Sequence, residues 1–310
     1  MSKKATREAL GATLVELVSE GVDIVVVEAD LSKSTTTNKL ADAYPERFFN
    51  VGIAEANMTD VAAGLAVAGK VAFTGSFAVF GTGRAYDQIR NTICYSGLNV
   101  KLTPTHAGIT VGPDGGSHQM IEDLALMRVL PGMRVLVPAD FNAAKAAIRC
   151  AATNPGPFYV RLGRATLPEV YPEGTEWELG RANVLRRGSD VTLAACGVMV
   201  AEALAAAELL AADGIEAEVI DVATVKPIDV GTIAESAKKT GAVVSCEEHS
   251  IIGGLGSAVA EVLGENAPTP LARVGVDDVF GTSGEPDELM AHFGLTAADI
   301  VVAARGLISA

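Results

Sequence analysis

Apolar residues follow two different spacings along the chain, and the two spacings alternate. Near the N-terminus, Leu10, Leu14, Leu17 and Val18 keep the i, i+4, i+7, i+8 interval that places side chains on one face of a helix. The run 23–30 is instead almost continuously apolar, which is typical of a parallel strand covered on both faces. The sequence therefore opens with a helix followed by a buried strand.

The same alternation continues through the rest of the chain. Apolar runs predict strands at 48–52, 70–77, 99–106, 133–139, 158–163, 190–197, 216–223 and 242–248. Small-residue and amphipathic stretches predict helices at 55–68, 141–153, 198–213, 230–239 and 254–264, and one more through Tyr86, Ile89 and Ile93. Strands that alternate with helices form mostly parallel sheets with helices on both faces. We therefore expect an α/β fold of two doubly wound, mostly parallel-sheet domains.

A change of composition separates the two expected domains. Residues 168–189 are rich in proline, glycine and charged residues, as linkers often are. A length of 310 residues also suits two domains of ordinary size. We predict a first domain at 1–170, a linker at 171–189 and a second domain at 190–310.

Composition and charge narrow the range of partners. Acidic residues outnumber basic ones 38 to 24, a formal net charge of −14, so the surface repels nucleic-acid backbones. The predicted elements are shorter than the ~18 apolar residues of a membrane helix, and the charged N-terminus lacks the apolar core of a signal peptide. The four cysteines lie far apart, without a Cys-x-x-Cys motif. We expect a cytoplasmic protein with free thiols and neither a membrane nor a nucleic-acid partner.

One acidic residue stands where α/β enzymes often place catalytic groups. Glu55 follows the strand predicted at 48–52 and begins the next helix. The helix dipole favours its carboxylate, whereas apolar neighbours such as Val51 and Ile53 would favour the neutral acid. An ordinary first-turn acid explains the same position, so the residue alone does not decide between structure and catalysis.

The most unusual segment is the glycine-rich stretch 106–119. It holds two of the four histidines, His106 and His118, with Asp114 between them, and its glycines permit close approach to a ligand. The spacing fits no common zinc pattern, so we predict no metal site in this chain. Upstream, Phe77 and Phe80 follow a strand, where they serve either as core residues or as a platform for a flat ring.

Together these motifs resemble a known family. The sequence is similar to the C-terminal half of transketolase, in the form of the enzyme that is split into two subunits. The similarity spans nearly the whole chain and rests on six stretches in order: ATREAL (5–10), EADLSKS (28–34), FFNVGIAEANM (48–58), GSFAVF (75–80), THAGITVGPDGGSHQ (105–119) and VRLGRATLP (160–168).

The resemblance implies thiamine diphosphate as cofactor. Glu55 matches the carboxyl beside N1′ of the aminopyrimidine, which helps the cofactor lose its C2 proton. Phe77, with Phe80 close by, would stack on the pyrimidine. Asp30 matches an acid near the thiazolium ring, and His118 matches the histidine near the reacting carbonyl.

The resemblance also implies a sugar phosphate substrate and the activity of a transferase. A two-carbon ketol unit would pass from a ketose phosphate to an aldose phosphate, as in pentose-phosphate metabolism. Asp114 matches an acid that binds an acceptor hydroxyl. A further four residues match groups that hold the terminal phosphate: His106, Arg164, Ser34 and Arg7.

A missing motif implies a partner chain. The GDG…N segment that holds Mg²⁺ and the diphosphate in this family is absent from the sequence. We therefore expect an N-terminal transketolase subunit to supply that half of the site with its Mg²⁺ or another divalent ion. The family relationship implies an α2β2 heterotetramer, and the chain alone should be inactive.

Three other functions fit parts of the pattern. The beta subunit of a thiamine-dependent 2-oxo-acid dehydrogenase shares the layout and the glutamate, but has no use for the phosphate-binding set. Deoxyxylulose-phosphate synthase is a relative that is normally one longer chain. A non-catalytic scaffold subunit would share the fold, although the retained Glu55, His106 and His118 argue against it.

Overall fold

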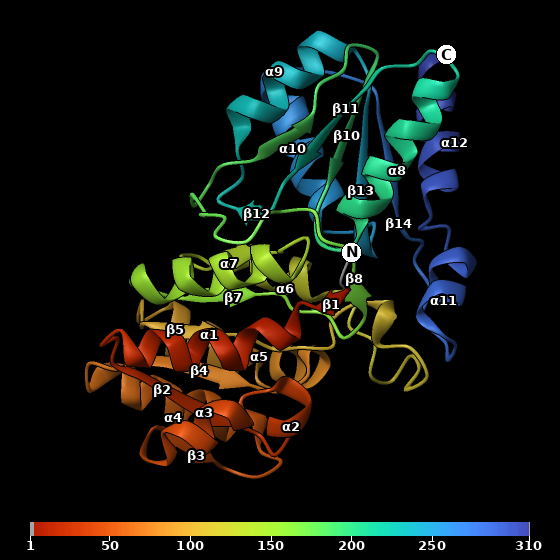
Figure 1. Ribbon diagram of the computed structural model, residues 1–310. Helices are drawn as coiled ribbons and strands as arrows, with labels where there is room; N and C mark the ends of the chain where they lie inside the picture. The colour runs from red at the N-terminus through yellow and green to blue at the C-terminus, as the bar shows by residue number, and fades with distance from the viewer. Residues whose placement is uncertain (1–2, 310) are drawn as a thin grey trace.

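The computed structural model describes residues 3–309 and contains two α/β units joined along a broad seam (Figure 1). Both sheets are mostly parallel and lie between helices, which confirms the predicted fold class. The N-terminal unit occupies the lower part of the view and the C-terminal unit the upper part.

The first sheet has seven strands, and neighbouring strands run parallel except at one edge. In spatial order they are β12 (Thr224–Lys226), β6 (Arg134–Leu136), β7 (Phe158–Val160), β5 (Val100–Leu102), β4 (Val71–Gly75), β2 (Ile24–Glu28) and β3 (Phe48–Asn50). The exception is β12, which comes from the C-terminal half of the sequence and pairs antiparallel with β6. The C-terminal half thus completes the sheet of the N-terminal unit.

Helices cover both faces of this sheet, and the N-terminal unit also contains shorter helical elements. They are α1 (Arg7–Ser19), α2 (Ser32–Thr35), α3 (Asn38–Ala43), η1 (Pro45–Arg47), α4 (Glu55–Val67), η2 (Val79–Arg84), α5 (Tyr86–Gln88), η3 (Ile89–Cys94), η4 (Ile109–Val111), α6 (Asp123–Val129) and α7 (Phe141–Thr153).

The strand β2 shows why its sequence is apolar throughout. Ile24 and Val26 join the apolar cluster of α1 and α7, whereas Val25 and Val27 join the cluster that includes α4 on the opposite face. Successive side chains of a strand point to opposite faces, so a strand covered on both sides needs an uninterrupted apolar run.

The second sheet has five strands, ordered β14 (Leu271–Val276), β13 (Val243–Ser250), β10 (Val191–Ala195), β11 (Ala217–Asp221) and β9 (Asn183–Arg186). Its helices are α8 (Met199–Ala212), α9 (Val230–Thr240), α10 (Leu255–Asn266), α11 (Pro286–His292) and α12 (Ala297–Ile308). The strand β9 lies within the segment predicted as a linker, and it pairs antiparallel with β11. That segment therefore contributes an edge strand to the second sheet.

Two further features concern the seam and the C-terminus. Strands β1 (Lys4–Ala5) and β8 (Thr166–Leu167) form a small antiparallel sheet near the seam. The stretch 286–308 has the length and hydropathy of a membrane span. It forms two helices separated near Gly294, whose φ of 68° interrupts helical geometry, and α12 packs against α8 and β14. All four cysteines are buried and free.

Candidate active site

The side chain of Glu55 lies at the N-terminus of α4, in the first turn after β3. Its exposed fraction is only 4%, so little water reaches the carboxylate. The guanidinium of Arg84 donates to Oε1 of Glu55 over 3.2 Å, and this arginine is itself about half exposed. Ile53 points to solvent with 76% of its surface exposed, so the apolar cover that we expected from this residue is absent.

Aromatic rings form a connected group beside this glutamate. The rings of Phe77 and Phe80 are 6.0 Å apart and inclined by 16°, and Phe77 stacks on His106 at 3.8 Å. The edge of His118 meets Phe80 at 5.3 Å, while the Arg84 guanidinium lies 4.3 Å from the centre of the Phe80 ring. Arg84 therefore links Glu55 to the aromatic group, and residues distant in sequence meet in one place.

The glycine-rich segment approaches this group with an unusual backbone. His106 has a φ of 60°, rare for a residue with a side chain, and its Nδ1 bonds to the Thr105 hydroxyl at 2.7 Å. Strained backbone of this kind concentrates at functional sites. Downstream, Asp114 is exposed and His118 is half-buried, so the acid and the second histidine remain accessible to a ligand.

Two arginines lie close together beside the same segment. The Thr6 hydroxyl accepts a bond from the Gly163 amide at 2.7 Å, which joins the segment before Arg7 to the one before Arg164. Arg7 donates to the Ser34 carbonyl at 2.7 Å, but its buried Nε has no hydrogen-bond partner. Burial and the charge of Arg164 both lower the pKa of Arg7. A buried donor without an acceptor beside a second cation is a place for an anion.

His106 belongs to the same cationic group but carries no charge at neutral pH. Burial, followed by the charges of Arg7, Arg164 and His118, lowers the pKa of His106 to about 3. The neutral ring can still donate one N–H. Arg164 also lies 3.8 Å from Asp114 and donates to the Val111 carbonyl, so it connects the anion site to the glycine-rich segment.

These contacts and charge interactions connect nine of the ten predicted site residues, and the tenth is Asp30. Asp30 is exposed, has a φ of 64° and accepts a bond from Asn50 at 3.0 Å. Nothing in residues 3–309 groups three or more metal-ligating side chains. Sequence reasoning missed Arg84, although its i, i+4 spacing from Phe80 was a signal that both lie on one helical face.

With this geometry in view, the chain can be compared with known proteins. Residues 2–169 match the family described as "Transketolase, pyrimidine binding domain", and residues 180–300 match "Transketolase, C-terminal domain".

The chain belongs to the transketolase family.

Similar proteins are themselves parts of split enzymes. The chain is 49% identical to the 6-deoxy-6-sulfo-D-fructose transketolase subunit SqwH of Clostridium sp. strain MSTE9, over 94% of this chain and 91% of the relative. It is 38% identical to one of the subunits of the apulose-4-phosphate transketolase of Phocaeicola vulgatus, over 94% of this chain and 93% of the relative. A structure described as "Split gene transketolase, inactive beta4 tetramer" superposes with a TM-score of 0.91 at 54% identity, covering 99% of each chain. The fold of these relatives therefore extends to this chain, which matches subunits of split transketolases over nearly their whole length.

Proposed function

We propose that this chain is the C-terminal subunit of a two-chain, thiamine diphosphate-dependent transketolase. The enzyme transfers a two-carbon ketol unit from a ketose phosphate to an aldose phosphate. The observation that carries the proposal is the placement of a buried carboxylate, an aromatic group and an anion site in one continuous arrangement. Each of the three suits a different part of the reacting system.

The residues of the first part fit an aminopyrimidine ring. Phe80 is a partly exposed flat apolar ring, backed by the buried Phe77. Glu55 holds its carboxylate nearby, where it would hydrogen-bond a ring nitrogen and place a proton there. Bound thiamine diphosphate supplies the carbon nucleophile and electron sink that amino-acid side chains lack. Arg84 contacts both Glu55 and Phe80, the two groups that would hold the ring.

The residues of the second part fit the anionic end of a sugar. Arg7 and Arg164 supply positive charge, and Arg7 has an unused buried N–H. Neutral His106 donates a hydrogen bond without adding repulsion between the cations. Charge-assisted bonds of this kind contribute roughly 1.5–3 kcal/mol each. His118 would contact the reacting carbonyl, Asp114 an acceptor hydroxyl, Ser34 the anion and Asp30 the thiazolium side.

The remaining part of the site comes from another chain. We infer that an N-terminal transketolase subunit holds the diphosphate with Mg²⁺ or another divalent ion, and that two copies of each chain assemble as an α2β2 enzyme in the cytoplasm. Two observations support this: the sequence lacks a GDG…N segment, and the related split transketolase is described as an inactive beta4 tetramer.

Arg7 and Arg164 could bind a substrate that ends in either a phosphate or a sulfonate. One relative is named for a sulfo sugar and the other for a phosphorylated sugar. Phosphate and sulfonate both present negatively charged oxygens to arginine. We propose phosphate, and the sulfonate becomes an outcome of the test.

The test is a reconstitution from separately purified chains. This chain, the N-terminal subunit and their mixture are each supplied with thiamine diphosphate, Mg²⁺, a ketose phosphate and an aldose phosphate. We expect ketol transfer from the mixture only. Activity of this chain alone would contradict partner dependence, and turnover of pyruvate instead of the ketose would favour a 2-oxo-acid dehydrogenase subunit. Faster turnover of a sulfo sugar would reassign the anion.

A further inference from the structure

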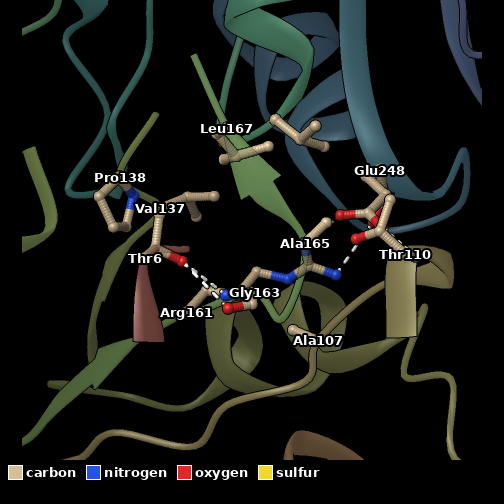
Figure 2. A pocket seen from close by; sticks show the side chains of 12 residues that line it. Thr6, Ala107, Thr110, Val137, Pro138, Arg161, Gly163, Ala165, Leu167 and Glu248 are labelled. Atoms are coloured by element: carbon tan, nitrogen blue, oxygen red, sulfur yellow. Dashed lines mark hydrogen bonds and ion pairs between the residues drawn. The ribbon is translucent and has the colours of Figure 1, made fainter. Parts of the chain in front are cut away.

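A buried cluster of charged residues spans the seam between the two domains. Arg161 follows β7 in the first domain, Glu248 belongs to β13 in the second, and both are more than nine-tenths buried. Figure 2 shows that their side chains point toward each other beside Thr110, at the edge of a water-sized cavity of about 20 Å³. The catalytic chemistry proposed above does not use these groups.

Arg161 connects the two domains through several contacts. Its guanidinium donates to Asp123 over 2.8 Å and to the Glu248 backbone carbonyl over 3.0 Å. The Glu248 carboxylate lies 3.6 Å from the guanidinium, so one cation neutralises a carboxylate from each domain. Burial alone would raise the pKa of Asp123, but the charge and hydrogen bonds of its partners, Arg161 first among them, lower it. The contacts with Arg161 hold Glu248 in a fixed position. The carboxylate oxygens of Glu248 can still accept further hydrogen bonds.

That spare capacity is directed at the glycine-rich segment. The Thr110 amide donates to Oε1 of Glu248 over 2.7 Å. Gly108, which has a φ of 80°, passes so close that a Cβ placed on it would lie 2.2 Å from the Glu248 carboxyl carbon. Only glycine fits both the backbone conformation and the contact. A residue of the second domain thus fixes the beginning of the segment that carries Asp114 and His118.

The end of the segment is tied to the second domain as well. Gln119 donates through Nε2 to the Ile109 carbonyl over 3.0 Å and to the Thr282 carbonyl over 2.9 Å. A Cβ placed on Gly116 would lie 2.5 Å from the Gly281 carbonyl oxygen, so the two backbones touch. Both ends of the segment therefore contact the C-terminal domain. Between them, Gly112 and Gly115 also pass close to the chain at 283–286, so the segment depends on that domain along its length.

The segment needs such support because of its composition. Four of the twelve residues from 108 to 119 are glycines, which lose more conformational freedom on ordering than other residues do. We propose that Glu248 is a positioning residue of the C-terminal domain, which holds the segment 108–119 in the geometry that binds the aldose acceptor. The inference rests on the proposed function for the identity of the ligand, but not for the anchoring itself.

The test compares two buried glutamates of the same domain in the assembled two-chain enzyme. Glu248→Ala removes the acceptor of the Thr110 amide. Glu218→Ala is the matched control, because Glu218 is equally buried and paired with Lys239 and Ser236, but lies within the C-terminal domain away from the segment. Glu248→Gln restores an oxygen acceptor without the charge. Hydrogen exchange over 108–119 and the kinetic constants for the aldose phosphate are measured for all three.

We expect Glu248→Ala to speed exchange in 108–119 at least tenfold and to raise KM for the aldose at least tenfold, with kcat changed less than threefold. Glu248→Gln should recover most of both effects, and Glu218→Ala should leave both near wild type. Equal effects of the two alanine variants, or unchanged exchange with Glu248→Ala, would overturn the inference. If Glu248→Ala does not fold, Gln119→Met is measured in the same way. It removes the hydrogen bonds from Gln119 to the Ile109 and Thr282 carbonyls and leaves Glu248 intact.

The outcomes separate this inference from the proposed function. Exchange in 108–119 needs no catalysis, so a loosened segment in an enzyme without ketol transfer keeps the anchoring role and removes the transketolase assignment. If the enzyme transfers ketol units but Glu248→Ala leaves exchange in 108–119 unchanged, the transketolase assignment stands and the anchoring role is lost.

Discussion

The two domains share one architecture but use their buried charged groups differently. In the N-terminal domain, Arg7 at the start of α1 and Arg164 after β7 lie close together, and one buried N–H of Arg7 is unused. In the C-terminal domain, buried carboxyl groups of β11 and β13 accept hydrogen bonds within the domain, as when Glu247 accepts from the amides of Leu255 and Gly256. The first arrangement can bind an anion, whereas the second holds the fold together. The fold alone therefore does not tell which domain is chemically active.

The largest difference between the two domains is expected when one buried glutamate in each is replaced by glutamine. In the reconstituted enzyme, Glu55→Gln should lower kcat by ~10²-fold or more, because it removes a proton-transfer group. Glu247→Gln should instead lower the melting temperature, because an amide cannot accept both α10 amides with oxygen, and kcat should stay within about twofold. A scaffold subunit would show unchanged turnover with Glu55→Gln.

A smaller effect is expected at the anion site. Arg7→Gln should raise KM for sugar phosphates by roughly 10- to 100-fold, the equivalent of one charge-assisted bond. The same variant should leave KM for a sugar without the terminal anion nearly unchanged. Arg149→Gln is the control, since Arg149 pairs with Glu16 and Glu20 on the outer surface between α1 and α7. An equal loss for both kinds of sugar would place Arg7 outside the anion site.

Acid should weaken the first domain through His106. Its folded pKa of about 3 lies below the unfolded value of 6.5, so the unfolded chain binds more protons between these values. Stability from this group is therefore complete above pH 6.5 and is lost as the pH falls toward 3. In thermal melts from pH 7 to 5, His106→Gln should lose less stability than wild type. Parallel pH profiles of the two proteins would contradict the assignment.

The second domain should respond in the opposite direction through Asp221. Burial raises its pKa to about 7, above the value of 3.8 in an unfolded chain, so the folded state binds more protons between these values. Stability from this group therefore falls as the pH rises from 3.8 to 7. Between pH 5 and 8, Asp221→Asn should gain stability relative to wild type, as measured by thermal melts. If the difference in melting temperature between Asp221→Asn and wild type narrows or reverses toward pH 8, Asp221 is already ionised in the folded protein.

Local sequence patterns predicted those parts of the fold whose cause is local. The helix expected at 141–153 matches α7 residue for residue, because its alanines and its Asp140 cap act within the segment. The strand β12 escaped prediction, since three residues paired to the sheet of the other domain carry no periodic signal. The four-residue strand β9, within the expected linker, also escaped prediction, although it pairs within the second sheet.

In the candidate site too, residues in continuous motifs could be predicted and residues brought in by distant contacts could not. Family motifs predicted the residues that surround the aromatic group, since each motif is a continuous stretch of sequence. Glu248 could not be found that way, because its partner Thr110 lies 138 residues away in the chain. Contacts of this kind depend on how the two domains meet, which the hydrophobic pattern of neither domain determines.

The central claim is that Glu55 activates a thiamine cofactor shared between two chains, and exchange of the cofactor's C2 proton tests it most directly. The two subunits are loaded with thiamine diphosphate and Mg²⁺ in deuterated buffer, quenched in acid, and the C2 proton is followed by NMR. The wild-type assembly should exchange this proton at least about 100-fold faster than the Glu55→Gln assembly and either chain alone. Equal rates for wild type and Glu55→Gln, with the cofactor shown to be bound in both, would contradict the account.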